Sequence, residues 1–259
     1  MTASEQPLVS VADGVLRIAV STAAAGTSLN FEAVSAGTDA VKNSGSEVGA
    51  VLLVGTGANF CAGGNVMAFA AAEDRTTYVR DAADTLHEFV AALESVGVPV
   101  VAGVHGWAAG AGMSLVCHAD IAIGSRSTKF RPAYPALGFT PDGGMSWALP
   151  RIVGPRRARD ILLSDTVLGG EEAHRLGLLT RLVGDDVVVS EAERVARSLA
   201  AGPAETIGAT KRLLAQSDTN SLAEQLEAEA VSISTLAGSP TGREGVDAFV
   251  EKRRPDFPR

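Results

Sequence analysis

The segment that most limits the possible fold is GAVLLVGTG at residues 49–57, a nearly continuous apolar run that ends in glycines. A strand covered by helices on both faces has this pattern, because neither of its faces meets water. Similar runs occur in PVVAGVHG at 99–106 and DIAIGS at 120–125, and GVLRIAVST at 14–22 is rich in β-branched residues. We therefore expect strands at these four positions.

Helical spacing separates these strands. Residues 76–97 place apolar side chains three and four positions apart, and Gly97 and Pro99 then end the pattern. This is the pattern of an amphipathic helix with its stop signal. Residues 30–42 have a looser version of the same spacing. Strands that alternate with helices in this way predict an α/β protein with crossover connections.

The pattern changes after about residue 155, where most segments have helical spacing. We expect helices at 156–165, 171–179, 190–200, 203–216, 221–236 and 242–254. The chain is therefore predicted to have two parts, an α/β core over residues 1–195 and a helical C-terminal region over residues 196–259.

Composition excludes several classes of protein. Of the 259 residues, 46% are hydrophobic and 20% are charged, as in globular proteins, and no apolar run reaches the ~18 residues of a membrane span. The first ten residues lack the features of a signal peptide. A net charge of −8 disfavours a nucleic-acid partner. Because Cys61 and Cys117 fit neither a zinc pattern nor a disulfide framework, we expect a reduced, cytoplasmic protein without a metal site.

Three glycine-rich segments adjoin the predicted strands: GTGANFCAGGN (55–65), HGWAAGAGMS (105–114) and FTPDGGMSW (139–147). The motif GxGxxG fails in the first two, because Phe60 and Leu115 stand in place of its last glycine, and GxxxxGK[ST] is absent. The serine-hydrolase motif GxSxG is absent as well. These absences disfavour nucleotide phosphate binding and a serine nucleophile.

The first two glycine-rich segments can instead present backbone N–H groups to a ligand, since glycine lets the backbone approach closely. HGWAAGAGMS leads directly into an apolar helix, whose first N–H groups have no partner within the helix. NFCAGGN (59–65) could direct a second N–H at the same atom, and two such donors would form an oxyanion hole. For each segment taken alone, close packing of helix and strand around small residues is the simpler explanation.

The third segment sets one carboxylate, Asp142, among glycines and apolar residues. A proline followed by Asp and Gly is ordinary in a tight turn. However, the apolar neighbours Leu137, Phe139 and Trp147 would exclude water from the carboxylate and make it a stronger base. The segment alone leaves both interpretations open.

Three longer regions that include these segments resemble one known family. They are VLLVGTGANFCAGGNV, PVVAGVHGWAAGAGMSLVCHADIAIGS and FRPAYPALGFTPDGGMSWALPRIVG. Their order, spacing and flanking strands resemble the enoyl-CoA hydratase/isomerase (crotonase) superfamily, from about residue 8 to the closing AFVEKRRPDF. The resemblance implies a crotonase-like spiral of ββα units, a helical C-terminal trimerisation region, and a homotrimer or a dimer of trimers. It also implies an acyl-CoA thioester as the small-molecule substrate, so that coenzyme A is part of the substrate and no separate cofactor is needed.

The resemblance assigns roles residue by residue. It puts the two oxyanion N–H groups on Gly64, which follows CAG, and on Ala111, the middle residue of a GxG turn. Asn65 stands where an aspartate is common in the family. Ala62 and residues 28–30 would line the adenine and pantetheine side, although the Asn-Arg-Pro turn usual after the second strand is absent.

One lysine and three histidines are further candidates for a role at the site, and each has a simpler structural explanation. Lys252, in the charged tail EKRRPDFPR (251–259), matches a position that in relatives can reach the CoA phosphates, sometimes from a neighbouring subunit. The alternative is a solvated helix end. We expect His105 and His118 to pack or to form hydrogen bonds rather than to catalyse. His87 lies beside the apolar stripe of the helix predicted at 76–97, and we expect it to have a surface or core role.

The catalytic positions depart from the hydratase pattern. Hydratases of the family carry two glutamates, at positions occupied here by Ser114 and Tyr134, which can hydrogen-bond to substrate but are not bases at neutral pH. Asp142 falls where several isomerases of the superfamily carry their essential aspartate. The resemblance therefore implies double-bond isomerisation, with Asp142 as the acid and base and the oxyanion hole holding the charge of a dienolate.

Three alternatives remain open. One is enoyl-CoA hydration, with a water molecule held by Asp142, Ser114 or Tyr134. Another is thioester hydrolysis or nucleophilic attack by Asp142. The third is an acyl-CoA-binding protein that has lost catalysis, which would explain the two missing glutamates.

Overall fold

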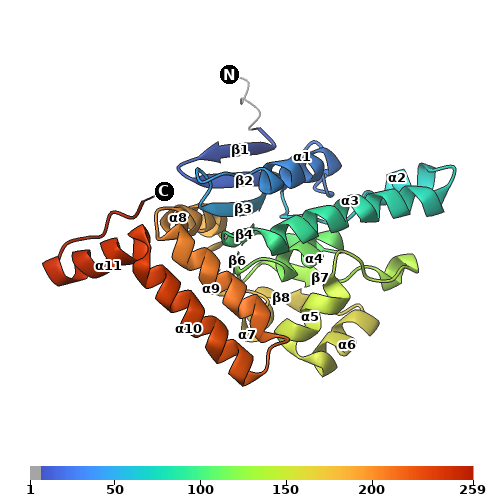
Figure 1. The fold of residues 1–259 in the computed structure, drawn as a ribbon. Helices are drawn as coiled ribbons and strands as arrows, with labels where there is room; N and C mark the ends of the chain where they lie inside the picture. Colours follow the sequence, from blue (N-terminus) through green and yellow to red (C-terminus); the bar gives the residue numbers. More distant parts are fainter. Residues whose placement is uncertain (1–6, 259) are drawn as a thin grey trace, which may run out of the picture.

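The main sheet positions the rest of the molecule. The computed structural model describes residues 7–258, where six strands pair in the order β1-β2-β3-β4-β6-β9 (Figure 1). They span Val9–Ala12 (β1), Val15–Ser21 (β2), Ala50–Gly55 (β3), Val100–Val104 (β4), Ile121–Ser125 (β6) and Arg181–Val183 (β9). β1 pairs antiparallel with β2, and the other pairs are parallel. The four strands expected from the sequence are β2, β3, β4 and β6.

Helices cover both faces of this sheet, as the continuous apolar runs predict. α1 (Phe31–Lys42) and α3 (Arg75–Ser95) cover one face, and α8 (Val188–Ala200) covers the other. Successive side chains of a strand point to opposite faces. Leu53 of β3 therefore joins the core under α1 and α3, whereas its neighbour Leu52 joins the core under α8.

A smaller sheet and several short helices complete this part of the molecule. β5 (Trp107–Ala109) pairs parallel with β7 (Lys129–Arg131), which pairs antiparallel with β8 (Leu168–Gly169). These strands are too short to produce a visible alternation of apolar and polar residues, so the sequence does not predict them. The short helices are α2 (Val66–Ala71), α4 (Ala111–Cys117), α5 (Met145–Val153), α6 (Pro155–Leu163) and α7 (Gly170–Arg175), with 3-10 turns at Pro135–Leu137 and Asp185–Val187.

The C-terminal helices form a layer of their own beside the sheet (Figure 1). α9 (Ala204–Ser217) packs against α10 (Leu222–Gly238), which packs against α11 (Pro240–Glu251). The expected boundary at residue 195 lies inside α8, because this helix continues to Ala200 and buries that residue against the sheet. The helical region therefore begins at α9. Residues 1–6, which belong to the predicted core and to the segment tested for a signal peptide, lie outside the described residues, as does the last residue of the charged tail.

Helices α10 and α11 leave many apolar side chains in water in the single chain. The exposed fraction is 85% for Phe249 and 71% for Ile233, and Leu222, Leu226, Val231, Val246 and Val250 are exposed as well. None of the helices within residues 7–258 is both long and apolar enough to cross a membrane.

Candidate active site

The three glycine-rich segments meet at one cavity of about 1030 Å³. Gly64 of the first segment, Ala111 of the second and Asp142 of the third all lie on its wall. Helices α2 and α3 supply much of the apolar lining through side chains such as Phe69 and Leu86. Segments that are far apart in the sequence thus contribute to one site.

Backbone hydrogen bonds join the first two segments. The N–H of Cys61 donates to the carbonyl oxygen of Trp107 at 3.1 Å, and the N–H of Ala109 donates to the carbonyl oxygen of Cys61 at 2.9 Å. Gly112 lies directly against this contact, where a Cβ atom would overlap the Cys61 carbonyl oxygen. The missing side chain of Gly112 therefore allows the two segments to approach this closely.

Two backbone N–H groups on the cavity wall have no acceptor among the described residues. Within residues 7–258 neither the Gly64 N–H nor the Ala111 N–H donates a hydrogen bond. Each follows a glycine with positive φ, Gly63 at 97° and Gly110 at 51°, a conformation that other residues rarely adopt. The backbone turns at these glycines and leaves the next N–H available at the cavity, where the sequence predicted the two oxyanion donors.

Asp142 is held by a tyrosine on the same wall. The Tyr134 hydroxyl donates to Oδ1 of Asp142 at 2.5 Å, and no residue of the described chain donates to Oδ2. Burial, and next the negative charge of Asp142, raise the pKa of Tyr134 far above its usual range, so the hydroxyl stays protonated and acts as a donor. Among the described residues that line the cavity, Asp142 is the only one with a carboxylate.

Ser114 lies behind the cavity wall rather than on it. The side chain is fully buried, and its hydroxyl donates to the backbone carbonyl oxygen of Asp142 at 2.9 Å. It also lies 3.2 Å from the Tyr134 hydroxyl. The expected substrate contact is therefore replaced by a contact with the backbone that carries Asp142, because α4 packs its whole length into the core.

The other assigned positions divide into two groups. Ala62 lies on the cavity wall, as does Leu29 from residues 28–30. Asn65 is instead the exposed N-cap of α2, where its Oδ1 accepts from the Ala68 N–H at 3.1 Å. Lys252 is the exposed C-cap of α11 and does not line the cavity of its own chain.

The apolar neighbours expected around Asp142 enclose it less than predicted. Leu137 and Phe139 line the cavity, but both remain exposed in the single chain. Trp147 is not on the wall; it lies on α5 with the Arg151 guanidinium 3.8 Å from its ring centroid. The periodicity of α5 explains this position. Met145, Ala148 and Leu149 form the buried side of the helix, and Trp147 lies on its exposed side.

The sequence analysis gave no role at the site to three side chains, which are those of His87, His118 and Glu94. His87 Nε2 accepts from the Gly143 N–H at 3.1 Å. His118 contacts the Gly143 carbonyl oxygen through Nε2 at 2.9 Å and Glu94 through Nδ1 at 2.6 Å. These contacts join residues that are far apart in the sequence, and two of them involve only backbone atoms of Gly143. A local sequence motif therefore cannot predict them. The hydrogen bonds of His118 agree with the expectation for that residue, whereas the bond from Gly143 to His87 was not expected.

Known proteins resemble this chain in both sequence and fold. Residues 11–259 match the family model described as enoyl-CoA hydratase/isomerase. A 1,2-epoxyphenylacetyl-CoA isomerase from Escherichia coli K12 is 37% identical over 216 residues, which is 80% of each chain. A probable enoyl-CoA hydratase from Rhodobacter capsulatus is 37% identical over 222 residues, which is 85% of each chain. The crystal structure of an enoyl-CoA hydratase from Polaromonas sp. JS666 superimposes with a TM-score of 0.90 at 29% identity, covering 96% of this chain and 98% of the other.

The fold and the cavity thus define an α/β enzyme of the crotonase type. The chain belongs to the enoyl-CoA hydratase/isomerase family. Membership in this family implies an acyl-CoA substrate.

Proposed function

We propose that this protein moves a carbon–carbon double bond along the acyl chain of an enoyl-CoA, with Asp142 as the acid and base. The observation that carries the proposal is the single carboxylate, among the described residues, on the cavity wall. A double-bond shift needs one base, which takes a proton from one carbon and returns it to another. Addition of water needs a group that activates the water and a group that supplies the proton.

The reaction begins with a 3-enoyl-CoA in the cavity. Asp142 removes a proton from the carbon next to the thioester carbonyl, and the electron pair moves into a dienolate whose negative charge rests largely on the thioester oxygen. Asp142 then returns the proton two carbons further along, which gives the conjugated 2-enoyl-CoA. The Tyr134 hydroxyl holds Oδ1, so Oδ2 is the oxygen that carries the proton.

The N–H groups of Gly64 and Ala111 would hold the thioester oxygen while it is negatively charged. Both lie on the cavity wall without an internal acceptor among the described residues. Removal of one oxyanion donor typically costs about a hundredfold to a thousandfold in rate. A structure with bound acyl-CoA should place the thioester oxygen within about 3 Å of both nitrogens; an oxygen bound elsewhere would exclude this role.

Hydration is the second candidate, because one relative is a probable enoyl-CoA hydratase. The cavity of this chain supports it less well. Ser114 is buried behind the wall, and the Tyr134 hydroxyl has a raised pKa and donates to Asp142. Neither side chain can therefore serve as the second acid or base that the two glutamates supply in family hydratases.

Self-association belongs to the same proposal. The exposed apolar side chains of α10 and α11 support a homotrimer or a dimer of trimers, since monomeric proteins rarely expose large contiguous apolar patches. In such an assembly Lys252 would reach the CoA phosphates of a neighbouring subunit, because it does not line the cavity of its own chain.

Product analysis with 3-enoyl-CoA and 2-enoyl-CoA tests the proposed reaction. We expect the first to become conjugated, and Asp142→Asn to lower kcat by about 10²–10⁴. Asp160→Asn, which changes an exposed aspartate of α6, is the matched control. Hydration of 2-enoyl-CoA without conversion of 3-enoyl-CoA would favour the hydratase. Binding of both without turnover would favour a non-catalytic binding protein, and full activity in Asp142→Asn would exclude this residue as the base.

A further inference from the structure

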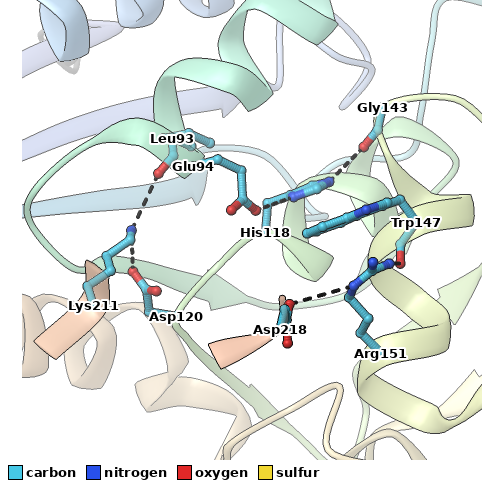
Figure 2. A network of polar contacts seen from close by, with 9 residues as sticks. All are labelled: Leu93, Glu94, His118, Asp120, Gly143, Trp147, Arg151, Lys211 and Asp218. Atoms are coloured by element: carbon cyan, nitrogen blue, oxygen red, sulfur yellow. Dashed lines mark hydrogen bonds and ion pairs between the residues drawn. The ribbon is translucent and has the colours of Figure 1, made fainter. Parts of the chain in front are cut away.

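The backbone on both sides of Gly143 is held by side chains from two helices. The peptide that joins Asp142 to Gly143 offers its carbonyl oxygen to Ser114 Oγ at 2.9 Å and its N–H to His87 Nε2 at 3.1 Å. The next carbonyl oxygen, that of Gly143, contacts His118 Nε2 at 2.9 Å (Figure 2). The residue that carries the base is thus attached to α3 through His87 and to α4 and its C-cap through the other two.

The partners of His118 require a hydrogen on both ring nitrogens. Nε2 faces a carbonyl oxygen, and Nδ1 faces a Glu94 carboxylate oxygen at 2.6 Å (Figure 2). A carbonyl oxygen can only accept. This bond to His118 holds the pKa of Glu94 below its usual value, so that its carboxylate is ionised and also accepts. His118, whose side chain is 2% exposed, thus faces an acceptor at each ring nitrogen, and an imidazolium with Glu94 as its counter-ion would satisfy both contacts.

His87 requires the opposite state. Its Nε2 faces an N–H donor, the Gly143 backbone amide. A ring nitrogen can accept only when it carries no hydrogen, so His87 is neutral with its hydrogen on Nδ1. The two histidines thus bind the two polar groups of one glycine, and each needs a different number of ring hydrogens.

The two glycines after Asp142 make these contacts possible. Gly143 and Gly144 have φ values of 56° and 74°, which favour glycine. A Cβ atom on Gly144 would lie 2.5 Å from His118 Nε2, and one on Gly143 would lie 2.9 Å from the Ser114 Cβ. The sequence Asp-Gly-Gly therefore brings the backbone within hydrogen-bond reach of α3 and α4.

The segment that carries Glu94 is itself anchored to the C-terminal helices. Lys211 of α9 donates to Asp120 Oδ2 at 2.7 Å and to the Leu93 carbonyl oxygen at 3.4 Å (Figure 2). The end of α3 next to Glu94 is thereby attached to α9. The chain of contacts runs from α9 through Glu94 and His118 to the backbone beside Asp142.

We propose that His87 and His118 are positioning residues, which hold the Gly143 backbone from its N–H and C=O sides, in neutral and protonated states respectively, and thereby fix the Asp142 carboxylate at the substrate. The effect on catalysis rests on the proposed function of Asp142. The protonation states and the contacts do not depend on it.

Ring nitrogen spectra of the ¹⁵N-histidine-labelled protein test the contacts without any activity. The chain has four histidines, and substitution of each in turn assigns their signals. At pH 7 we expect both nitrogens of His118 to carry hydrogen and Nε2 of His87 to carry none. A neutral His118, or a hydrogen on Nε2 of His87, would overturn the proposal.

Kinetics of His87 variants test the positioning role, because His87 is exposed and its replacement leaves the core intact. His87→Leu removes the acceptor and should lower kcat by about ten- to a hundredfold, the scale of a 1 Å misplacement, with KM changed less than about twofold. His87→Gln restores an acceptor oxygen and should recover most of kcat. His174→Leu, on the distant helix α7, is the control.

Equal kcat values for His87→Leu and His174→Leu would exclude the positioning role of His87. If the wild-type protein fails to isomerise any enoyl-CoA, the proposed function fails, whereas the nitrogen spectra still decide whether the two histidines hold the backbone as described. The two failures are therefore distinguishable.

Discussion

Tyr134 donates its hydroxyl hydrogen to Oδ1 of Asp142 across 2.5 Å, from a buried position in the wall that both residues share. This bond leaves the other carboxylate oxygen, Oδ2, without a donor among the described residues. The Tyr134 hydroxyl thus bonds to the one carboxylate among the described residues that line the cavity.

Tyr134→Phe should lower kcat by about ten- to a hundredfold with little change in KM. A hydrogen bond to a charged group contributes about 1.5–3 kcal/mol, and its loss lets the carboxylate rotate away from the substrate. Steady-state kinetics with 3-enoyl-CoA measure the effect. Tyr78→Phe is the matched control, since Tyr78 is the other tyrosine of the chain; equal effects in the two variants would contradict the role of the Asp142 bond.

Gly144→Ala should destabilise the protein more than Gly138→Ala does. Both glycines have similar positive φ values, 74° and 69°, so both substitutions carry the backbone strain of about 1–3 kcal/mol. Only at Gly144 does the new Cβ meet His118; at Gly138 no atom of residues 7–258 lies within 4 Å. Denaturant unfolding measures the difference, and equal losses would mean that the His118 contact is not needed for stability.

Glu94→Gln should change how stability depends on pH. The folded-state pKa of Glu94 is lowered by its bond to His118. A lowered pKa stabilises the fold above the unfolded-state value, ordinarily about 4.5, and this stabilisation disappears as the pH falls through the folded-state value. Unfolding midpoints between about pH 6 and pH 3 should therefore fall more steeply for the wild type than for the variant, and parallel curves would refute the effect.

Phe249→Glu should weaken self-association. The ring is 85% exposed on α11, and a charge there opposes burial in an interface. Light scattering after size exclusion should give a larger mass for the wild type than for the variant, with unchanged circular dichroism. Arg243→Glu, a charge change on the same helix, controls for the added charge. A monomeric wild type would refute the proposed assembly.

The sequence predicted the fold best where its elements are long. The strand at 49–57 and the helix at 76–97 each have enough residues to display a period, and β3 and α3 lie there. β8 has only two residues and depends on pairing with a distant strand, which no local pattern encodes. The expected boundary at residue 195 falls within α8, because this helix has the same spacing as the C-terminal helices although it packs on the sheet.

The sequence predicted the candidate site in part. Asp142, Gly64 and Ala111 belong to recognisable segments, and the structure brings them to one cavity. His87 and His118 reach the site by contacts with the backbone of Gly143, which is 56 and 25 residues away from them in the sequence. Every residue except proline has the same backbone N–H and C=O groups. The sequence therefore does not indicate which backbone group a histidine side chain contacts.

The buried position of Ser114 leaves no room for a larger side chain at this point of α4. Its Cβ already lies so close to Gly143 that a Cβ there would approach to 2.9 Å, and no part of its side chain is exposed. A glutamate at 114 would overfill this space and displace the loop that carries Asp142. Position 114 therefore accepts a larger acidic side chain only together with a change in the loop that carries Asp142.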